Sequence, residues 1–259
     1  MKAVAILPAR MGSSRFPGKP LARLAGRTMI EHVYQRTRLC GGLAAVYVAT
    51  CDEDIAGAAR AFGAPVIMTA ATHERASERI AEAARHLDAD VVVLVQGDEP
   101  MIVPEMIDEA LQPMLQDPHV LCTNLTAPIL TADEFEDRNT IKVVLGANGD
   151  ALYFSREPIP TRQRLAFEEL EAWKQVCVIP YRRDFLFRYV ELAPTPLEIA
   201  ESIDMLRLLE HGYPVRMVKT LHRTQSVDTP ADLARVEGLM KRDPLLERYT
   251  GGQVAAPLR

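Results

Sequence analysis

The first half of the chain alternates short apolar runs with amphipathic stretches, and this alternation constrains its fold more than any other feature. Four apolar runs of strand length occupy 3–7, 45–50, 66–69 and 91–95. Between consecutive runs, side chains that suit one face of a helix recur three or four residues apart. The three helical stripes consist of Ile30, Val33, Tyr34 and Thr37, then Ile55, Ala58, Ala59 and Phe62, then Ile80, Ala83, Ala84 and Leu87. Repeated strand–helix units predict an α/β fold with a mostly parallel sheet, right-handed crossovers and helices on both faces.

The segment after the first run, 8–19, combines turn residues with positive charge. Its glycines and serines let backbone N–H groups approach an anion, while Arg10, Arg15 and Lys19 supply charge that suits a polyphosphate. A solvated basic connector is the alternative, which cations alternating with turn residues disfavour. The segment is not a Walker A element, because Pro20 stands where Ser or Thr would hold the metal, and the chain has no G-x-G-x-x-G motif.

A second polar segment, 96–100, follows the fully apolar run 91–95 and reads Gln-Gly-Asp-Glu-Pro. The amide of Gln96 and the exposed backbone can bind a base edge, and the carboxylate of Asp98 can hold Mg²⁺ beside phosphates. The alternative is a simple turn in which Asp98 caps a helix. Ligands of parallel sheets lie beyond the carboxyl ends of the strands, so we expect this segment to lie beside 8–19.

A third segment, 226–233, reads Ser-Val-Asp-Thr-Pro-Ala-Asp-Leu. Taken alone, Asp228-Thr229-Pro230 is an ordinary helix start, with a capping oxygen followed by proline in the first turn. That interpretation suits Thr229 and leaves the carboxylate of Asp228 for another role.

The three segments together resemble the sugar nucleotidyltransferases, most closely the CMP-Kdo synthetase (3-deoxy-manno-octulosonate cytidylyltransferase) family, from about residue 3 to 240. That family opens with I-P-A-R-x-x-S-x-R-x-P-G-K-P-L, which positions 6–21 match except for Leu7. It also has Q-G-D-E-P and V-D-T-P-E-D-L, whose first aspartates share Mg²⁺ and correspond to Asp98 and Asp228. The resemblance implies a Rossmann-like nucleotidyltransferase sheet, Mg²⁺ as cofactor, and transfer of CMP from CTP to an acidic sugar with release of pyrophosphate.

The resemblance also implies roles for individual residues. The catalytic residues would be Arg10, Lys19, Asp98 and Asp228, the last two as metal ligands. The nucleotide-binding residues would be Pro8, Ala9, Arg10, Gly12, Ser13, Arg15, Lys19, Ser77, Arg79, Gln96 and Gly97. The acceptor-binding residues would be Arg156, Gln175, Tyr181, Glu198 and Glu201.

Short strand-like runs separated by polar or Pro-rich loops occupy about 120–190 and predict a smaller mixed β subdomain. In the family such a sheet covers the acid-sugar site and forms the contact of a homodimer. We therefore expect one nucleotidyltransferase domain over 1–245, which includes this subdomain, and a flexible tail over 246–259.

The chain departs from the family pattern at several positions. The base-contacting loop of the family, H-x-S-G-T-[DE]-R, has Arg75 and Ala76 in place of its Ser-Gly pair. In the acceptor half, Gln175, Ile179 and Met205 replace a histidine, a tyrosine and a glutamine. Because a lost buried polar contact costs about 1–3 kcal/mol, these changes predict weak binding of Kdo and leave open another 2-keto-3-deoxy acid as the acceptor.

Composition agrees with a soluble cytoplasmic enzyme. The net charge of −5 argues against nucleic-acid binding, and the four scattered cysteines favour a reduced compartment over a disulfide framework or a zinc site. The first apolar run is too short for a signal peptide, and no run approaches the roughly 20 residues of a membrane span. Two other functions remain open: a nucleotidyltransferase for a different nucleotide or acceptor, and a non-catalytic nucleotide-binding regulator.

Overall fold

The structure is a computed structural model that describes residues 1–12 and 16–251. Its larger sheet has the strand order β11-β6-β1-β4-β5. These strands are β1 (Ala3–Ala9), β4 (Ala45–Thr50), β5 (Val66–Met68), β6 (Val91–Val95) and β11 (Val178–Arg182). The first four run parallel, and β11 pairs with β6 in the antiparallel direction. The mostly parallel α/β sheet expected from the sequence is therefore confirmed.

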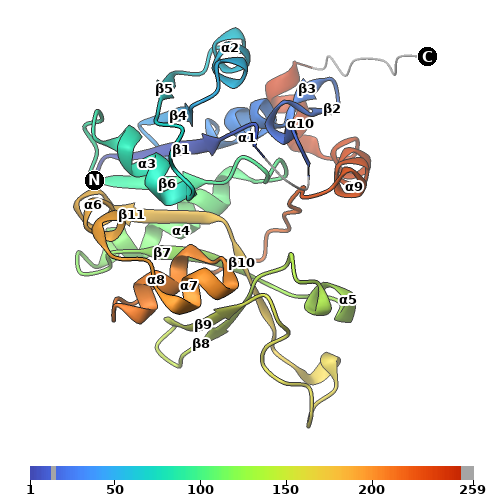
Figure 1. The fold of residues 1–259 in the computed structure, drawn as a ribbon. Coiled ribbons are helices and arrows are strands. Elements are labelled where there is room, and N and C mark those ends of the chain that lie inside the picture. The colour runs from blue at the N-terminus through green and yellow to red at the C-terminus, as the bar shows by residue number, and fades with distance from the viewer. Residues whose placement is uncertain (13–15, 252–259) are drawn as a thin grey trace.

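Helices cover both faces of this sheet (Figure 1). On one face pack α1 (Met29–Thr37), α2 (Glu53–Ala61) and α4 (Pro104–Gln116). On the other face pack α3 (Ala76–Ala84) and α6 (Arg183–Glu191). Successive side chains of a strand point to opposite faces, so Ala3, Ala5 and Leu7 of β1 enter one core while Val4 and Ile6 enter the other. Burial on both faces explains why the strands are almost wholly apolar.

A second, mixed sheet lies beside the first and has the order β12-β7-β10-β8-β9. Its strands are β7 (Thr123–Pro128), β8 (Lys142–Leu145), β9 (Ala151–Ser155), β10 (Trp173–Val176) and β12 (Arg216–Lys219). The pairing of β12 with β7 is parallel, and the other pairs are antiparallel. Only Cys177 separates β10 from β11, so one stretch of chain joins the two sheets.

Shorter elements complete the described part of the chain. They are η1 (Lys19–Leu21), β2 (Arg23–Leu24), β3 (Arg27–Thr28), α5 (Ala132–Glu136), η2 (Phe167–Glu169), α7 (Pro196–Glu201), α8 (Asp204–Glu210), α9 (Pro230–Met240) and α10 (Pro244–Thr250). None of the described helices is long and apolar enough to cross a membrane.

The flexible tail expected over 246–259 is wrong for its first part. Residues 246–250 belong to α10, which buries Leu245 and Leu246 against the rest of the chain. Tyr249 of this helix shares a 2.7 Å hydrogen bond between its hydroxyl and Nδ1 of His32 in α1. Residues 252–259 lie outside the described part of the chain.

Candidate active site

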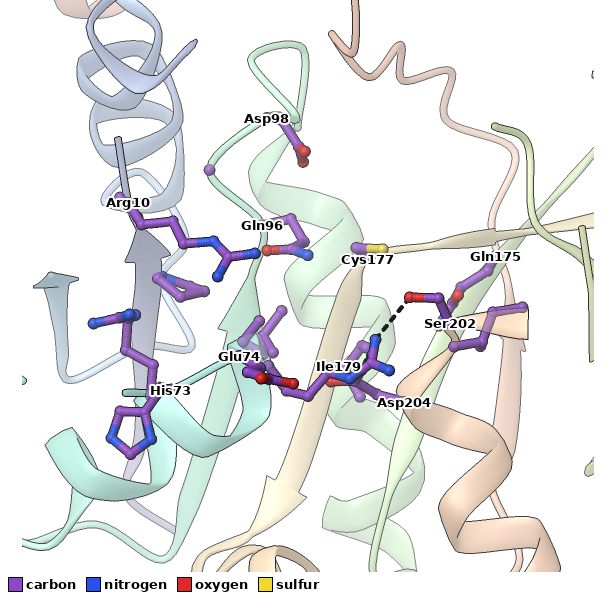
Figure 2. A pocket seen from close by; sticks show the side chains of 18 of the residues that line it. Arg10, His73, Glu74, Gln96, Asp98, Gln175, Cys177, Ile179, Ser202 and Asp204 are labelled. Atoms are coloured by element: carbon purple, nitrogen blue, oxygen red, sulfur yellow. Dashed lines mark hydrogen bonds and ion pairs between the residues drawn. The ribbon is translucent and has the colours of Figure 1, made fainter. Parts of the chain in front are cut away.

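A cavity of about 560 Å³ opens where the carboxyl ends of β1 and β6 face the second sheet and the α7–α8 turn. In Figure 2, Arg10 and His73 lie on one side of it, Gln175, Ser202 and Asp204 lie on the other, and Gln96 and Asp98 lie between. The predicted site residues that line it are Pro8, Ala9, Arg10, Gly12, Lys19, Arg79, Gln96, Gly97, Asp98, Arg156, Gln175 and Tyr181. Two further predicted residues, Ser13 and Arg15, lie outside the described part of the chain.

The two predicted loops meet because β1 and β6 are adjacent and parallel. Arg10 follows the last residue of β1, and Gln96 follows the last residue of β6. Glycine suits this close packing at Gly97, where an added Cβ would lie 3.3 Å from the Pro8 carbonyl oxygen and 3.3 Å from Cδ1 of Ile30, tighter than an ordinary contact. The backbone segments that follow β1 and β6 therefore lie side by side at the cavity.

At one end of the cavity, Lys19 joins two carboxylates from distant parts of the chain. Its Nζ lies 2.7 Å from Oδ2 of Asp98 and 3.3 Å from Oδ1 of Asp228. Burial lowers the pKa of Lys19, but the two carboxylates together raise it by more, so the net shift is upward. The ammonium therefore stays charged throughout the neutral range.

Backbone contacts hold the two carboxylates in place. The N–H of Val227 donates to the Asp98 carbonyl oxygen at 2.9 Å, which fixes segment 226–228 beside the exit of β6. Thr229 caps α9 by accepting a hydrogen bond from the N–H of Asp232, as its sequence position suggested. The side chain of Asp228 is thus left to face Lys19.

This pair of carboxylates fits a hard divalent cation. Both reach a single ammonium, so they converge on one point of positive charge. The described residues contain no group of three or more His, Cys, Asp or Glu side chains that could hold a metal. Two carboxylates with water and phosphate oxygens in the remaining positions are a common way for proteins to hold Mg²⁺, and a purely protein cage is not needed.

Glu99, next to Asp98, is a buried structural group. Burial raises the pKa of Glu99 to about 7, although the hydrogen bond that Thr224 donates to Oε2 at 2.6 Å opposes the shift. The contact ties the segment before Asp228 to the exit of β6. The sequence of segment 96–100 did not indicate that the carboxyl groups of Asp98 and Glu99 lie in different environments.

The start of α3 forms another wall of the cavity. Arg79 is almost fully buried and donates from Nη1 to Oγ1 of Thr69 at 2.5 Å and to the Ala70 carbonyl oxygen at 3.2 Å. Ser77 is fully buried and does not line the cavity; its hydroxyl donates to Oδ2 of Asp204 at 2.8 Å. The predicted direct contact of Ser77 with a nucleotide is corrected to a role in orienting Asp204.

In the second half of the cavity, the predicted acceptor residues are held by their neighbours. Gln175 donates from Nε2 to Oδ1 of Asn124 at 2.6 Å. The buried hydroxyl of Tyr181 makes no hydrogen bond with a described residue. Arg156 donates from Nε, Nη1 and Nη2 to the carbonyl oxygens of Glu201, Arg138 and Ser202, so each nitrogen of its guanidinium already has a partner.

Three other acceptor expectations are corrected by the structure. Glu198 is buried and accepts from Nε and Nη2 of Arg207 at 2.6 and 2.7 Å. Glu201 accepts from the hydroxyl of Ser155 at 2.7 Å, and neither glutamate lines the cavity. Met205 is fully buried in the core, so its replacement of a glutamine removes no contact from the cavity.

Sequence reasoning gave Arg75, Ser202 and Asp204 no role in the site. Nη1 of Arg75 donates to Oγ of Ser202 at 2.9 Å (Figure 2) and lies 3.6 Å from Oδ1 of Asp204. Burial raises the pKa of Asp204, although the hydrogen bond from Ser77 opposes the shift. The sequence showed Arg75 as a departure from the family loop, whereas no feature of the sequence around Asp204 indicates that it lines the cavity.

Known proteins resemble this chain over most of its length. A family model described as cytidylyltransferase matches residues 4–222. The chain is 46% identical over 251 residues to a 3-deoxy-manno-octulosonate cytidylyltransferase of Geobacter metallireducens, covering 93% of this chain and 99% of that protein. It is 44% identical over 251 residues to the protein of the same name from Geotalea uraniireducens, covering 93% of this chain and 100% of that protein.

Solved structures give the same result. The structure of CMP:2-keto-3-deoxy-manno-octonic acid synthetase complexed with CTP superposes with a TM-score of 0.87 at 42% identity, covering 93% of this chain and 99% of that one. A cytidylyltransferase from Leptospira borgpetersenii superposes with a TM-score of 0.63 at 16% identity, covering 94% and 88% of the two chains, which is a likeness of fold alone.

Proposed function

Since the chain belongs to the cytidylyltransferase family and within it to the 3-deoxy-manno-octulosonate cytidylyltransferases, we propose that it transfers CMP from CTP to a hydroxyl of Kdo. The observation that carries the proposal is that Lys19 contacts both Asp98 and Asp228, and that Lys19, Asp98 and Arg10 line one cavity with Arg75 and groups of the second sheet.

In the proposed reaction, the acceptor hydroxyl attacks the α-phosphorus of CTP in line. The bond between the α-phosphorus and the bridging oxygen breaks, pyrophosphate leaves, and the proton of the hydroxyl passes to water. Arg10 and Lys19, which line the cavity, neutralise phosphate charge. Such a transfer needs positioning and charge neutralisation from the protein more than covalent participation.

Asp98 and Asp228 are the residues that would hold Mg²⁺ in this proposal. A bound Mg²⁺ would neutralise phosphate oxygens and lower the pKa of an oxygen bound to it. Lys19 contacts the same two carboxylates, and Asp98 lines the cavity together with Gln96 and Gly97, which supports a site for phosphate at this end.

We also propose a homodimer in the cytoplasm. Four cysteines without disulfide bonds, all among the described residues, support a reducing compartment. The second sheet ends in β9, an edge strand that exposes Leu152, and such an edge supports association with a second copy.

Release of pyrophosphate from CTP, measured with Kdo and with a panel of other 2-keto-3-deoxy acids, tests the proposal. In contrast to the weak binding of Kdo predicted from the sequence, we expect Kdo to support a kcat/KM above about 10⁴ M⁻¹s⁻¹, as is usual for true substrates. The reason is the 46% identity to a 3-deoxy-manno-octulosonate cytidylyltransferase over 93% of the chain. In competition among the four nucleoside triphosphates, CTP should be used in preference to the others.

Three results would contradict it in different ways. Turnover of another acid with little turnover of Kdo would show that Gln175 and Ile179 have changed the acceptor. Preference for another triphosphate would show that CTP is not the nucleotide substrate. Binding of CTP without pyrophosphate release for any acceptor would identify a non-catalytic nucleotide-binding protein.

A further inference from the structure

Arg75 extends across the cavity from the start of α3 to the α7–α8 turn. It is the N-cap residue of α3, and its Nη1 donates to Oγ of Ser202 at 2.9 Å. Its ion pairs are long: Nε lies 3.7 Å from Oε1 of Glu198, and Nη1 lies 3.6 Å from Oδ1 of Asp204. The side chain is 23% exposed. Its charge therefore lies beside the cavity near two carboxylates, neither of which is within hydrogen-bond distance.

Two arginines close to the α7–α8 turn, Arg207 and Arg156, donate their hydrogen bonds to the protein itself. Arg207 is only 3% exposed and makes two short hydrogen bonds to Glu198, at 2.6 and 2.7 Å. Arg156 donates from all three guanidinium nitrogens to carbonyl oxygens. By contrast, Nε and Nη2 of Arg75 make no hydrogen bond with any residue in the described ranges. Of these three guanidiniums, Arg75 therefore has the most donors available to a ligand.

The surroundings strengthen the attraction of Arg75 for an anion. The cavity wall on this side includes the apolar side chains of Ile141, Ile179 and Ile203. A charge pair surrounded by hydrocarbon is screened less than one in water, so a carboxylate entering here gains most from a nearby guanidinium. The acidic partners can give up Arg75, because Glu198 keeps Arg207 and Asp204 keeps the hydroxyl of Ser77.

We infer that Arg75 determines acceptor specificity by binding the carboxylate of the acceptor acid through Nε and Nη2. This inference rests on the proposed function, since it takes an acid as the acceptor. The residue proposed to bind the carboxylate is thus one at which this chain departs from the family loop, which has a serine there. Arg75 would bind the acid in the ground state, so its removal should raise KM for the acid more than it lowers kcat.

The test compares the acid with its carboxamide in the wild type and in Arg75→Ala. Binding of each to protein loaded with a non-hydrolysable CTP analogue is measured by calorimetry, so that the result does not depend on turnover. We expect the wild type to bind the acid at least about tenfold more tightly than the amide, as a charge-assisted hydrogen bond predicts. In Arg75→Ala this ratio should fall to about 1, and the Kd for the CTP analogue should stay within about twofold.

Arg75→Gln keeps a donor for Ser202 without the charge and gives the same readout if the alanine variant is poorly folded. Arg85→Ala, an exposed arginine that follows the same helix, is the matched control and should keep the wild-type ratio.

An unchanged acid-to-amide ratio in a folded Arg75 variant would overturn the inference, as would a loss of CTP affinity in place of acid affinity. If the wild type releases no pyrophosphate with Kdo, the proposed function fails, and the ratio is then measured with whichever acid of the panel binds. If no acid binds to the wild type, both proposals fall.

Discussion

Lys19 stands at the point where two loops from opposite ends of the chain converge. Its ammonium contacts both Asp98 and Asp228, and all three side chains are largely buried. A substitution at one of them changes the charge that the other two experience, so their effects on activity will not add. The charge of this group, rather than its shape alone, is what the proposed reaction requires.

Asp98→Asn tests this requirement because asparagine keeps the size of the side chain and removes its negative charge. We expect kcat/KM to fall by about a hundredfold or more, with the melting temperature close to that of the wild type. Binding of Mn²⁺ to the CTP-loaded protein, followed by electron paramagnetic resonance, should weaken in parallel. Asp184→Asn, at a 98% exposed side chain, is the control. Near-wild-type activity in folded Asp98→Asn would remove the metal assignment.

Residues that follow buried strands could be placed from the sequence, and residues on short helices could not. Arg10 and Asp98 reach the cavity because strand direction and adjacency fix where they emerge. For Glu198, Glu201 and Met205, the outcome depends on how α7 and α8 pack against β9, and a helix of one or two turns carries too little pattern to show its buried side.

At the scale of elements, α10 is held in place by contacts with α1 that cannot be recognised from the sequence of α10 itself. His32 and Arg36 of α1 both contact the hydroxyl of Tyr249, and Arg36 also forms an ion pair with Asp243. The partners lie more than 200 residues apart in the chain. The expectation of a flexible tail from residue 246 failed for this reason.

The buried histidine in this contact makes stability depend on pH. Burial lowers the pKa of His32 from 6.5 to about 4, although the hydrogen bond to the Leu24 carbonyl oxygen opposes the shift. Between these two values the unfolded chain binds a proton that the folded chain does not, so stability falls as the pH drops from about 6.5 to 4. The loss amounts to a few kcal/mol, at about 1.4 kcal/mol per pKa unit.

Urea unfolding at pH 7 and pH 4.5 measures this effect. The wild type should lose more stability between the two values than His32→Gln, which cannot take up the proton. His86→Gln, at an exposed histidine, should behave like the wild type. An identical pH dependence in the wild type and His32→Gln would assign the acid sensitivity to other groups.

At the scale of the whole molecule, the two halves of the cavity come from two different sheets joined by the continuous stretch β10–β11 (Figure 1). The positions of Arg10, Gln96 and Asp98 could be predicted, since they lie in loops that directly follow β1 and β6, two adjacent parallel strands. The second sheet was predicted only in part, because β12 (216–219) joins it from outside 120–190 by pairing with β7. Such long-range pairing is set by tertiary packing and not by local propensity.

The edge of the second sheet carries the last prediction. The edge strand β9 exposes Leu152 at 63%, and an apolar edge of this kind is usually covered by another surface. We expect sedimentation velocity to show a dimer for the wild type and a monomer for Leu152→Asp, because a buried, unpaired carboxylate would oppose the contact. Leu239→Asp, at a 49% exposed leucine of α9, should remain a dimer. A monomeric wild type, or a dimer that survives Leu152→Asp, would exclude β9 as the dimer contact.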